Sequence, residues 1–212
     1  MNSALNVLVS RLMTALFANR RSRIVASLVA VVVAALSGVT AFGPGANTGS
    51  TTAAPAKQGN YSLKGKVVQV ADGDTFTVLV DGRQQRVRLA SIDAPETTKD
   101  RQQPGQPMAQ ASKDALARLV AGKNVDLSCY ERDPYDRNIC DVFLADGSSA
   151  NQQQVAMGMA WANMEGRGKY MRDPKLPVLE QKARQARLGL WRDANPVKPW
   201  VWRYQCWKKA QC

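Results

Sequence analysis

Residues 63–92 read LKGKVVQVADGDTFTVLVDGRQQRVRLASI, and this stretch contains three consecutive segments with the character of β-strands. Leu63–Val70, Thr75–Val80 and Arg86–Ile92 are rich in apolar and β-branched residues, which favour extended structure. Asp81-Gly82 lies between the second and third segments and is a strong signal for a tight hairpin turn. The stretch therefore predicts three strands that follow one another closely.

Two details of these strands follow from the residue pattern. Gly65 is expected to form a bulge in the first strand, where a residue without a side chain is easily accommodated. Side chains alternate between the two faces of a strand, so Val87 and Leu89 share one face of the third strand. Arg86 and Arg88 are then expected on the opposite face.

The rest of the chain supplies two further strands and three helices. A polar segment with Pro104 and Gly105 is expected to form a mobile loop, and Trp191, Trp200 and Trp202 are expected to cover the core from an extended tail. One helix between the third and fourth strands, and helices after the last strand, predict an α+β fold that is mainly a β-barrel: an OB-fold, with a five-stranded Greek-key barrel and three helices. The additional strands are predicted at 124–130 and 138–144, the helices at about 107–120, 150–157 and 175–188, and the loop at 97–106.

The first sixty residues resemble an export signal. Ile24–Phe42 contains no charged residue and follows the basic segment Arg20-Arg21-Ser22-Arg23. Two alternatives remain open: cleavage after Ala41, or a membrane anchor through residues 24–43, since about 20 apolar residues can span a bilayer. Either predicts a domain outside the cytoplasm, secreted or anchored to the plasma (inner) membrane. Met13 is an alternative start to Met1.

The composition divides the chain into four segments. A signal peptide or signal anchor over 1–42 is followed by a linker of mainly Gly, Ala, Thr, Ser and Pro over 43–60. The folded domain is expected over 61–203 and a C-terminal tail over 204–212. We expect the domain to be a monomer.

The charge of the chain points to a polyanionic partner and excludes several chemistries. The 212 residues carry a formal net charge of +12, and 24 basic against 17 acidic residues follow the first sixty. Nucleic acid is the commonest polyanion that a basic domain attracts. There is no histidine, which excludes histidine-based triads, histidine general bases and most histidine-containing zinc sites.

Carboxylates and arginines recur in three short motifs. Asp72-Gly73-Asp74-Thr75 precedes the second strand, and Asp93-Ala94-Pro95-Glu96 follows Arg88 by a few residues. Tyr135-Asp136-Arg137 comes about forty residues later. Carboxylate oxygens hold hard divalent cations, and the planar guanidinium group holds phosphate. A site that combines both is equipped to hydrolyse a phosphodiester.

These motifs, in this order, resemble the staphylococcal nuclease-like (thermonuclease) family over about residues 61–203. Gly158-Met159-Ala160-Trp161 and Gly189-Leu190-Trp191 extend the resemblance. The family implies a five-stranded OB barrel and Ca²⁺-dependent hydrolysis of DNA and RNA. A noncatalytic OB-fold module that binds nucleic acid is the alternative, but such a module has no need of the three acids together.

The resemblance also implies a role for each site residue. Asp74 and Asp93 would bind the metal together with the main-chain carbonyl of Ala94. Glu96 would activate the attacking water, while Arg88 and Arg137 would hold the scissile phosphate.

Tyr135 would then lie beside the bound nucleotide. The chain departs from the family pattern at Ala94, where a threonine can stand, and at Asp136, which replaces a glycine and could weaken the hold of Arg137 on phosphate.

Four cysteines suggest disulfides if the domain is exported. Cys129 and Cys140 flank the connection between the fourth and fifth strands, so a bridge could cross that hairpin. Cys206 and Cys212 could close a small terminal loop, and free thiols are the alternative for both pairs.

Overall fold

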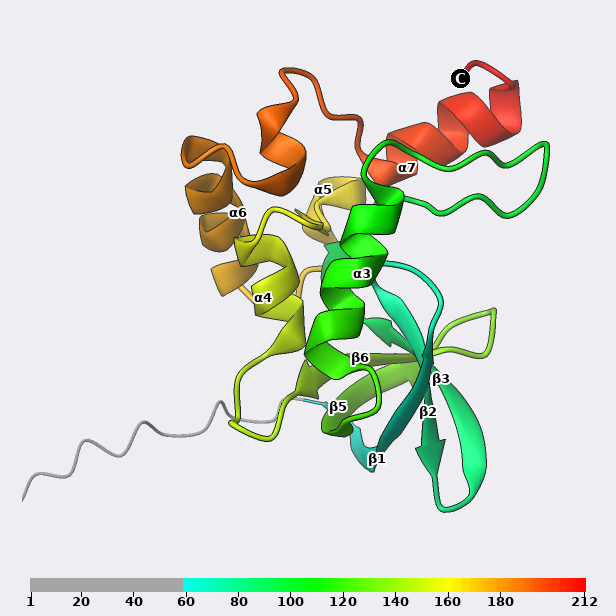
Figure 1. The fold of residues 1–212 in the computed structure, drawn as a ribbon, viewed down its shortest axis with the longest axis vertical. Coiled ribbons are helices and arrows are strands. Elements are labelled where there is room, and N and C mark those ends of the chain that lie inside the picture. Colours follow the sequence, from blue (N-terminus) through cyan, green and yellow to red (C-terminus); the bar gives the residue numbers. More distant parts are fainter. Residues whose placement is uncertain (1–58) are drawn as a thin grey trace, which may run out of the picture. The chain divides into compact units, whose positions relative to one another are not determined.

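The computed structural model describes residues 59–212 (Figure 1). The export signal, the alternative start at Met13 and most of the predicted linker lie outside these residues. Among residues 59–212, no helix combines the length and apolar character needed to cross a bilayer.

Five strands close into a barrel (Figure 1). Their order is β1-β2-β3-β6-β5, and β1 pairs with β5 to complete the ring. Neighbouring strands are antiparallel except β3 and β6, which run parallel. This arrangement confirms the predicted OB-type barrel in an α+β fold. The strands are β1 (Tyr61–Val70), β2 (Thr75–Val80), β3 (Arg83–Leu89), β5 (Asn124–Arg132) and β6 (Asn138–Phe143).

The barrel interior is filled by the apolar face of each strand. Val87 and Leu89 of β3 are buried, whereas Arg86 is exposed and Arg88 is partly buried, which confirms the predicted alternation. Removal of these apolar surfaces from water is the main favourable term in folding. Other buried barrel residues are Val67, Phe76, Val78, Val125, Leu127 and Val142.

The third strand ends three residues earlier than the sequence pattern predicts. Strand β3 stops at Leu89, and Ser91 adopts a left-handed conformation with φ of 64°. The chain then forms a separate two-residue strand, β4 (Ile92–Asp93), which pairs with β7 (Trp161–Ala162). This turn directs Asp93 away from the barrel sheet and into a buried position opposite Trp161.

Three helices match the predicted ones and cover one end of the barrel. They are α3 (Ala109–Val120), α4 (Ala150–Ala156) and α6 (Lys175–Gln185). Helix α3 begins two residues later than predicted, because Met108 is left-handed and precedes the helix. Its buried residues are Ala109, Ser112, Ala115, Leu116 and Val120.

The C-terminal region is helical, which corrects the prediction of an extended tail. Trp191 is buried against Trp161, with Trp200 packed on the same small cluster, so both cover the core as expected. Trp202 instead donates a hydrogen bond to the carbonyl oxygen of Pro104. The short segments are α5 (Glu165–Gly168), the 3₁₀ helix η1 (Gly189–Arg192), α7 (Pro199–Trp202) and the π-helix η2 (Arg203–Lys208).

The bulge in β1 lies at Val68 rather than at Gly65. The register shifts between Val67 and Gln69, and the extra residue is exposed. Gly65 serves a different purpose, since a Cβ atom there would lie 2.2 Å from the carbonyl oxygen of Leu79. The absence of a side chain lets β1 and β2 approach each other.

We expect Gly65→Ala to lower the free energy of unfolding by about 3 kcal/mol, because the obstacle is backbone and the strands must separate. Urea unfolding measures the change, with Lys66→Ala as a control. Lys66 is an exposed neighbour, and its replacement is expected to alter stability by less than about 0.5 kcal/mol. A loss below about 1 kcal/mol for Gly65→Ala would contradict this account of the glycine.

Candidate active site

The turn between β1 and β2 fixes the position of Asp74. The main-chain N–H of Asp74 donates to Oδ1 of Asp72 at 3.2 Å, so Asp72 shapes the turn. A Cβ atom at Gly73 would lie 1.9 Å from Oγ of Ser112, and Nε2 of Gln154 donates to the Gly73 carbonyl at 2.7 Å. The turn therefore packs directly against α3 and α4, and this contact requires glycine.

Arg88 joins the two predicted metal ligands. Its partner across the β2–β3 ladder is Thr75, which places Arg88 beside Asp74. Nη1 of Arg88 donates to Oδ1 of Asp74 at 2.8 Å, and Nη2 donates to Oδ1 of Asp93 at 2.8 Å. Oδ2 of Asp74 also accepts from the N–H of Ala94 at 2.9 Å. Three of the residues singled out from sequence thus meet in one buried site.

Arg203 is a further member of the site, and no motif in the sequence pointed to it. Its Nη1 donates to Oδ1 of Asp93 at 3.1 Å and to Oε1 of Glu96 at 2.6 Å. Its Nη2 donates to Oδ2 of Asp93 at 2.8 Å. We call Asp74, Asp93 and Glu96 the carboxylate cluster, and Arg88 and Arg203 bridge its members.

The site carries more negative than positive charge. Asp72 and Glu165 lie at its edge with Lys99, whose Nζ is 3.3 Å from Oδ2 of Asp72. Within the described part of the chain, five carboxylates therefore share three cationic groups. Such an excess favours binding of another cation.

Burial and mutual repulsion affect the acids of the cluster. Burial raises the pKa of Asp74 above its usual range, and Asp72 adds to the shift while Arg88 opposes it. Burial likewise raises the pKa of Glu96, with a further contribution from Asp74 and an opposing one from Arg203. Burial would lower the pKa of Arg203, but Asp93 and Glu96 outweigh it and raise that pKa. A positive charge placed among these carboxylates stabilises their ionised form.

The donor atoms of the cluster suit a hard cation, although the carboxylates are held by guanidinium groups. Within residues 59–212, no three acidic or cysteine side chains converge on an empty cation position. Nitrogen atoms of Arg88 and Arg203 lie between the carboxylates instead. Carboxylate and carbonyl oxygens are the ligands that Ca²⁺ prefers. The residues present therefore fit calcium by their chemistry.

Arg137 and Tyr135 lie in the turn between β5 and β6. In the described part of the chain Arg137 pairs with Asp133, through Nε at 2.7 Å and Nη2 at 2.6 Å, and not with the carboxylate cluster. Its guanidinium lies 5.4 Å from the ring centre of Tyr135, which is 71% exposed. The parallel register of β3 and β6 pairs Arg88 with Ile139, so this turn adjoins the strand that carries Arg88.

Asp136, which departs from the family pattern, does not contact Arg137 in the structure. Its carboxylate accepts from Nη1 of Arg132 at 2.6 Å. Its φ is 57°, a left-handed conformation that glycine adopts freely and aspartate more readily than most residues. The requirement of the turn explains why glycine is usual there, and Asp133 is the acid that holds Arg137.

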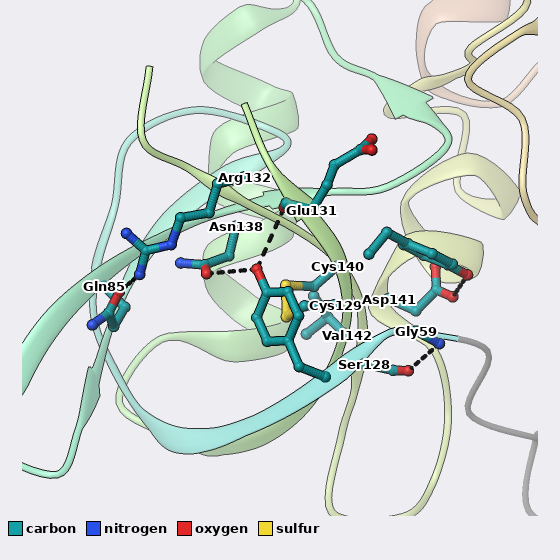
Figure 2. Close-up of a disulfide and its surroundings, with 12 residues drawn as sticks. Gly59, Gln85, Ser128, Cys129, Glu131, Arg132, Asn138, Cys140, Asp141 and Val142 are labelled. Carbon is teal, nitrogen blue, oxygen red and sulfur yellow. Dashed lines mark hydrogen bonds between the residues drawn. A yellow bond between two sulfur atoms is a disulfide. The ribbon is translucent and has the colours of Figure 1, made fainter. Parts of the chain in front are cut away.

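Two disulfides occur, in the pairings suggested by the sequence. Cys129 and Cys140 are directly opposed on β5 and β6 and buried in the barrel, and Cys206 pairs with Cys212. Figure 2 shows the first bridge beside Asn138, whose Oδ1 accepts from the hydroxyl of Tyr61 at 2.9 Å. The bridge and this hydrogen bond tie together the base of the hairpin that carries Tyr135 and Arg137.

The structure defines an OB-fold protein with a buried cluster of carboxylates and guanidiniums, a site suited to phosphate chemistry. The profile of the staphylococcal nuclease homologue family matches residues 86–193. The chain belongs to the staphylococcal nuclease-like family, as its motifs predicted.

Two relatives show how closely the chain resembles named members. One from Escherichia coli O157:H7, called an uncharacterized endonuclease, is 42% identical over 143 residues, 68% of this chain and 86% of that protein. A micrococcal nuclease from Shigella flexneri is 38% identical over 149 residues, 66% of this chain and 80% of that protein. These similarities support a hydrolase of the nuclease class, with nucleic acid as substrate.

Proposed function

We propose that the protein is an exported, Ca²⁺-dependent endonuclease that hydrolyses phosphodiester bonds of DNA and RNA. The observation that supports it best is the carboxylate cluster, in which Arg88 holds Asp74 and Asp93, and Arg203 holds Asp93 and Glu96. A noncatalytic binding module needs basic residues but has no use for two buried acids, Asp74 and Asp93, beside the partly buried Glu96, since buried charges are costly to maintain.

Asp74, Asp93 and the main-chain carbonyl of Ala94 are the proposed calcium ligands. When bound there, calcium would neutralise charge that accumulates on the phosphate during displacement. The protein contributes the rigidity of this ligand set. Asp74 is fixed by the Ala94 N–H and by Arg88, and the completely buried Asp93 is fixed between two arginines.

Glu96 and the arginines carry out the remaining steps of the proposed reaction. Glu96 is the proposed general base, and its carboxylate takes the proton of the attacking water. Arg88 is proposed to hold the scissile phosphate as well as Asp74 and Asp93, since a guanidinium has five N–H donors where lysine has a single ammonium group. Arg137 is proposed to hold the same phosphate from the neighbouring turn, and the exposed Tyr135 to contact the adjoining nucleotide.

Export is proposed from the leader and is supported by the cysteines. Two disulfides in residues 59–212 suit an oxidising compartment, and calcium is plentiful outside the cytoplasm. The nuclease domain would be secreted or anchored through residues 24–43. Fractionation of cells would test the proposal, and a protein found wholly in the cytoplasm would contradict it.

Closed circular substrates test the proposed activity most clearly because they have no ends. We expect the purified protein, with calcium, to cut both circular duplex DNA and circular single-stranded RNA. Gel electrophoresis follows the loss of the circular forms. Binding of both circles without cleavage would instead support the noncatalytic module, and cleavage of DNA alone would restrict the proposed substrate range.

A further inference from the structure

Arg203 reaches the carboxylate cluster from outside the part of the chain that matches the family profile, which ends at residue 193. It belongs to the π-helix η2, and its side chain is 29% exposed. It forms a two-nitrogen fork on Asp93 and a third bond to Glu96. Charge-assisted bonds of this kind, to two acids at once, fix the orientation of both side chains.

The C-terminal segment is anchored next to the cluster by two tryptophans. Nε1 of Trp202 and Nε1 of Trp207 both donate to the carbonyl oxygen of Pro104, at 3.0 Å and 2.9 Å. Figure 1 shows α7 and the following segment beside the loop that precedes α3. The Cys206–Cys212 disulfide closes the end of the segment. The segment is therefore fixed at the loop that follows Glu96, and Arg203 is directed at the acids.

Among residues 59–212, no other side chain donates a hydrogen bond to the Glu96 carboxylate. Its other oxygen lies 4.0 Å from Nζ of Lys99, beyond hydrogen-bonding distance. Its main chain is fixed, since the N–H donates to Gln106 at 2.9 Å and the carbonyl accepts from the Gln106 N–H at 2.8 Å. Arg203 is thus the residue that orients the carboxylate of Glu96.

Arg203 also affects how strongly the cluster attracts a cation. A carboxylate offers about four acceptor positions, and Arg88 and Arg203 together occupy three of those of Asp93. An acceptor position remains for a metal. The positive charge of Arg203 nevertheless opposes a divalent ion bound to the same carboxylate.

We propose that Arg203 is a positioning residue of the nuclease, which orients Glu96 and Asp93 for the reaction and weakens the binding of a divalent cation to the cluster. This inference rests on the proposed function. A purely structural role for Arg203 would change the turnover number and the affinity for calcium in the same direction. The proposed role predicts that its removal changes them in opposite directions.

The test compares Arg203→Gln and Arg203→Lys in the full-length protein. For Arg203→Gln we expect kcat on duplex DNA to fall roughly 10- to 100-fold with KM within about twofold, because Glu96 loses its orientation. Calorimetric titration with CaCl₂, without nucleic acid, should show binding about fivefold tighter, because a positive charge is removed. Arg203→Lys should restore the weaker calcium binding but little of kcat, since one ammonium group cannot bridge both acids.

Two further variants serve as controls. Lys208→Gln removes a positive charge from an exposed position of the same π-helix and should leave kcat, KM and calcium affinity unchanged. Trp207→Phe removes one anchoring hydrogen bond without touching the cluster, and a decrease in kcat at unchanged KM would support positioning by the segment. Trp207→Phe also serves as the test variant if Arg203→Gln does not fold.

Several results would overturn the inference. An unchanged kcat in both Arg203 variants, or an effect confined to KM, would show that Arg203 does not position the acids. A kcat above that of the wild type would show that Arg203 blocks the site. A wild-type protein without nuclease activity would overturn the proposed function, and the calcium titration would still decide whether Arg203 weakens metal binding.

Discussion

Asp93→Asn is expected to lower kcat/KM on duplex DNA by about 10²- to 10³-fold, the usual effect of losing one preorganised electrostatic contact. Asp93 is completely buried and accepts hydrogen bonds from both Arg88 and Arg203. An amide keeps the shape of the side chain and one carbonyl oxygen but removes the negative charge, so the attraction for the proposed calcium ion is weakened. Initial rates at saturating calcium measure the change.

The same substitution should also lower stability, and the assay must separate the two effects. The variant replaces a carboxylate that faces two guanidinium groups with a neutral amide, so a buried ion pair is lost. This loss lowers the free energy of unfolding by about 3 kcal/mol. Rates are therefore measured well below the unfolding temperature of the variant, as recorded by circular dichroism. Asp126→Asn is the matched control, because Asp126 forms a surface pair with Lys64 at 3.4 Å, far weaker than a buried pair. An Asp93→Asn protein that keeps more than a tenth of wild-type activity would show that the reaction does not need a negative charge at this position.

Arg88→Lys is expected to lower kcat/KM by about 10²-fold although it preserves the charge. The guanidinium of Arg88 donates to Asp74 and Asp93 with different nitrogens, each at 2.8 Å. A single ammonium group cannot occupy both positions or present a fork to phosphate. The variant therefore loses the alignment of the two acids and the proposed phosphate contact together.

Arg83→Lys provides the control for this substitution, since Arg83 is an exposed residue of the same strand. It should keep wild-type rates and stability. Thermal unfolding of Arg88→Lys should show that the free energy of unfolding falls by about 1–3 kcal/mol, which is the contribution of hydrogen bonds to charged groups. Activity within fivefold of wild type in Arg88→Lys would mean that the two-nitrogen geometry is not needed for the reaction.

The barrel was predictable from sequence because its strands show local alternation. The third strand alternates apolar Val87 and Leu89 with Arg86 and Arg88. The structure confirms that the apolar pair is buried and the arginines are more exposed. The end of that strand was not predictable in the same way. Ser91 adopts a left-handed conformation that an apolar pattern running to Ile92 does not indicate. This turn matters for the site, because it directs Asp93 to its buried position.

The candidate site was predicted only in part, because some of its contacts join residues that no local sequence pattern connects. Asp74, Arg88 and Asp93 belong to motifs with a recognisable spacing, and the structure brings them together. Arg203 is separated from Asp93 by 110 residues and has no motif around it. The partner of Arg137 was also missed, because the turn directs Asp136 to Arg132 and leaves Asp133 to hold the arginine. Contacts of this kind depend on backbone conformation and tertiary packing.

The most direct test of the proposed function is the rate of cleavage of a defined DNA duplex as a function of calcium concentration. Purified full-length protein is first freed of metal with a chelator and then titrated with CaCl₂. We expect no cleavage without calcium, a rate that rises to saturation as calcium is added, and complete loss when chelator is restored. A rate in chelator equal to that in calcium would contradict the assignment of the carboxylate cluster as a calcium site for phosphodiester hydrolysis.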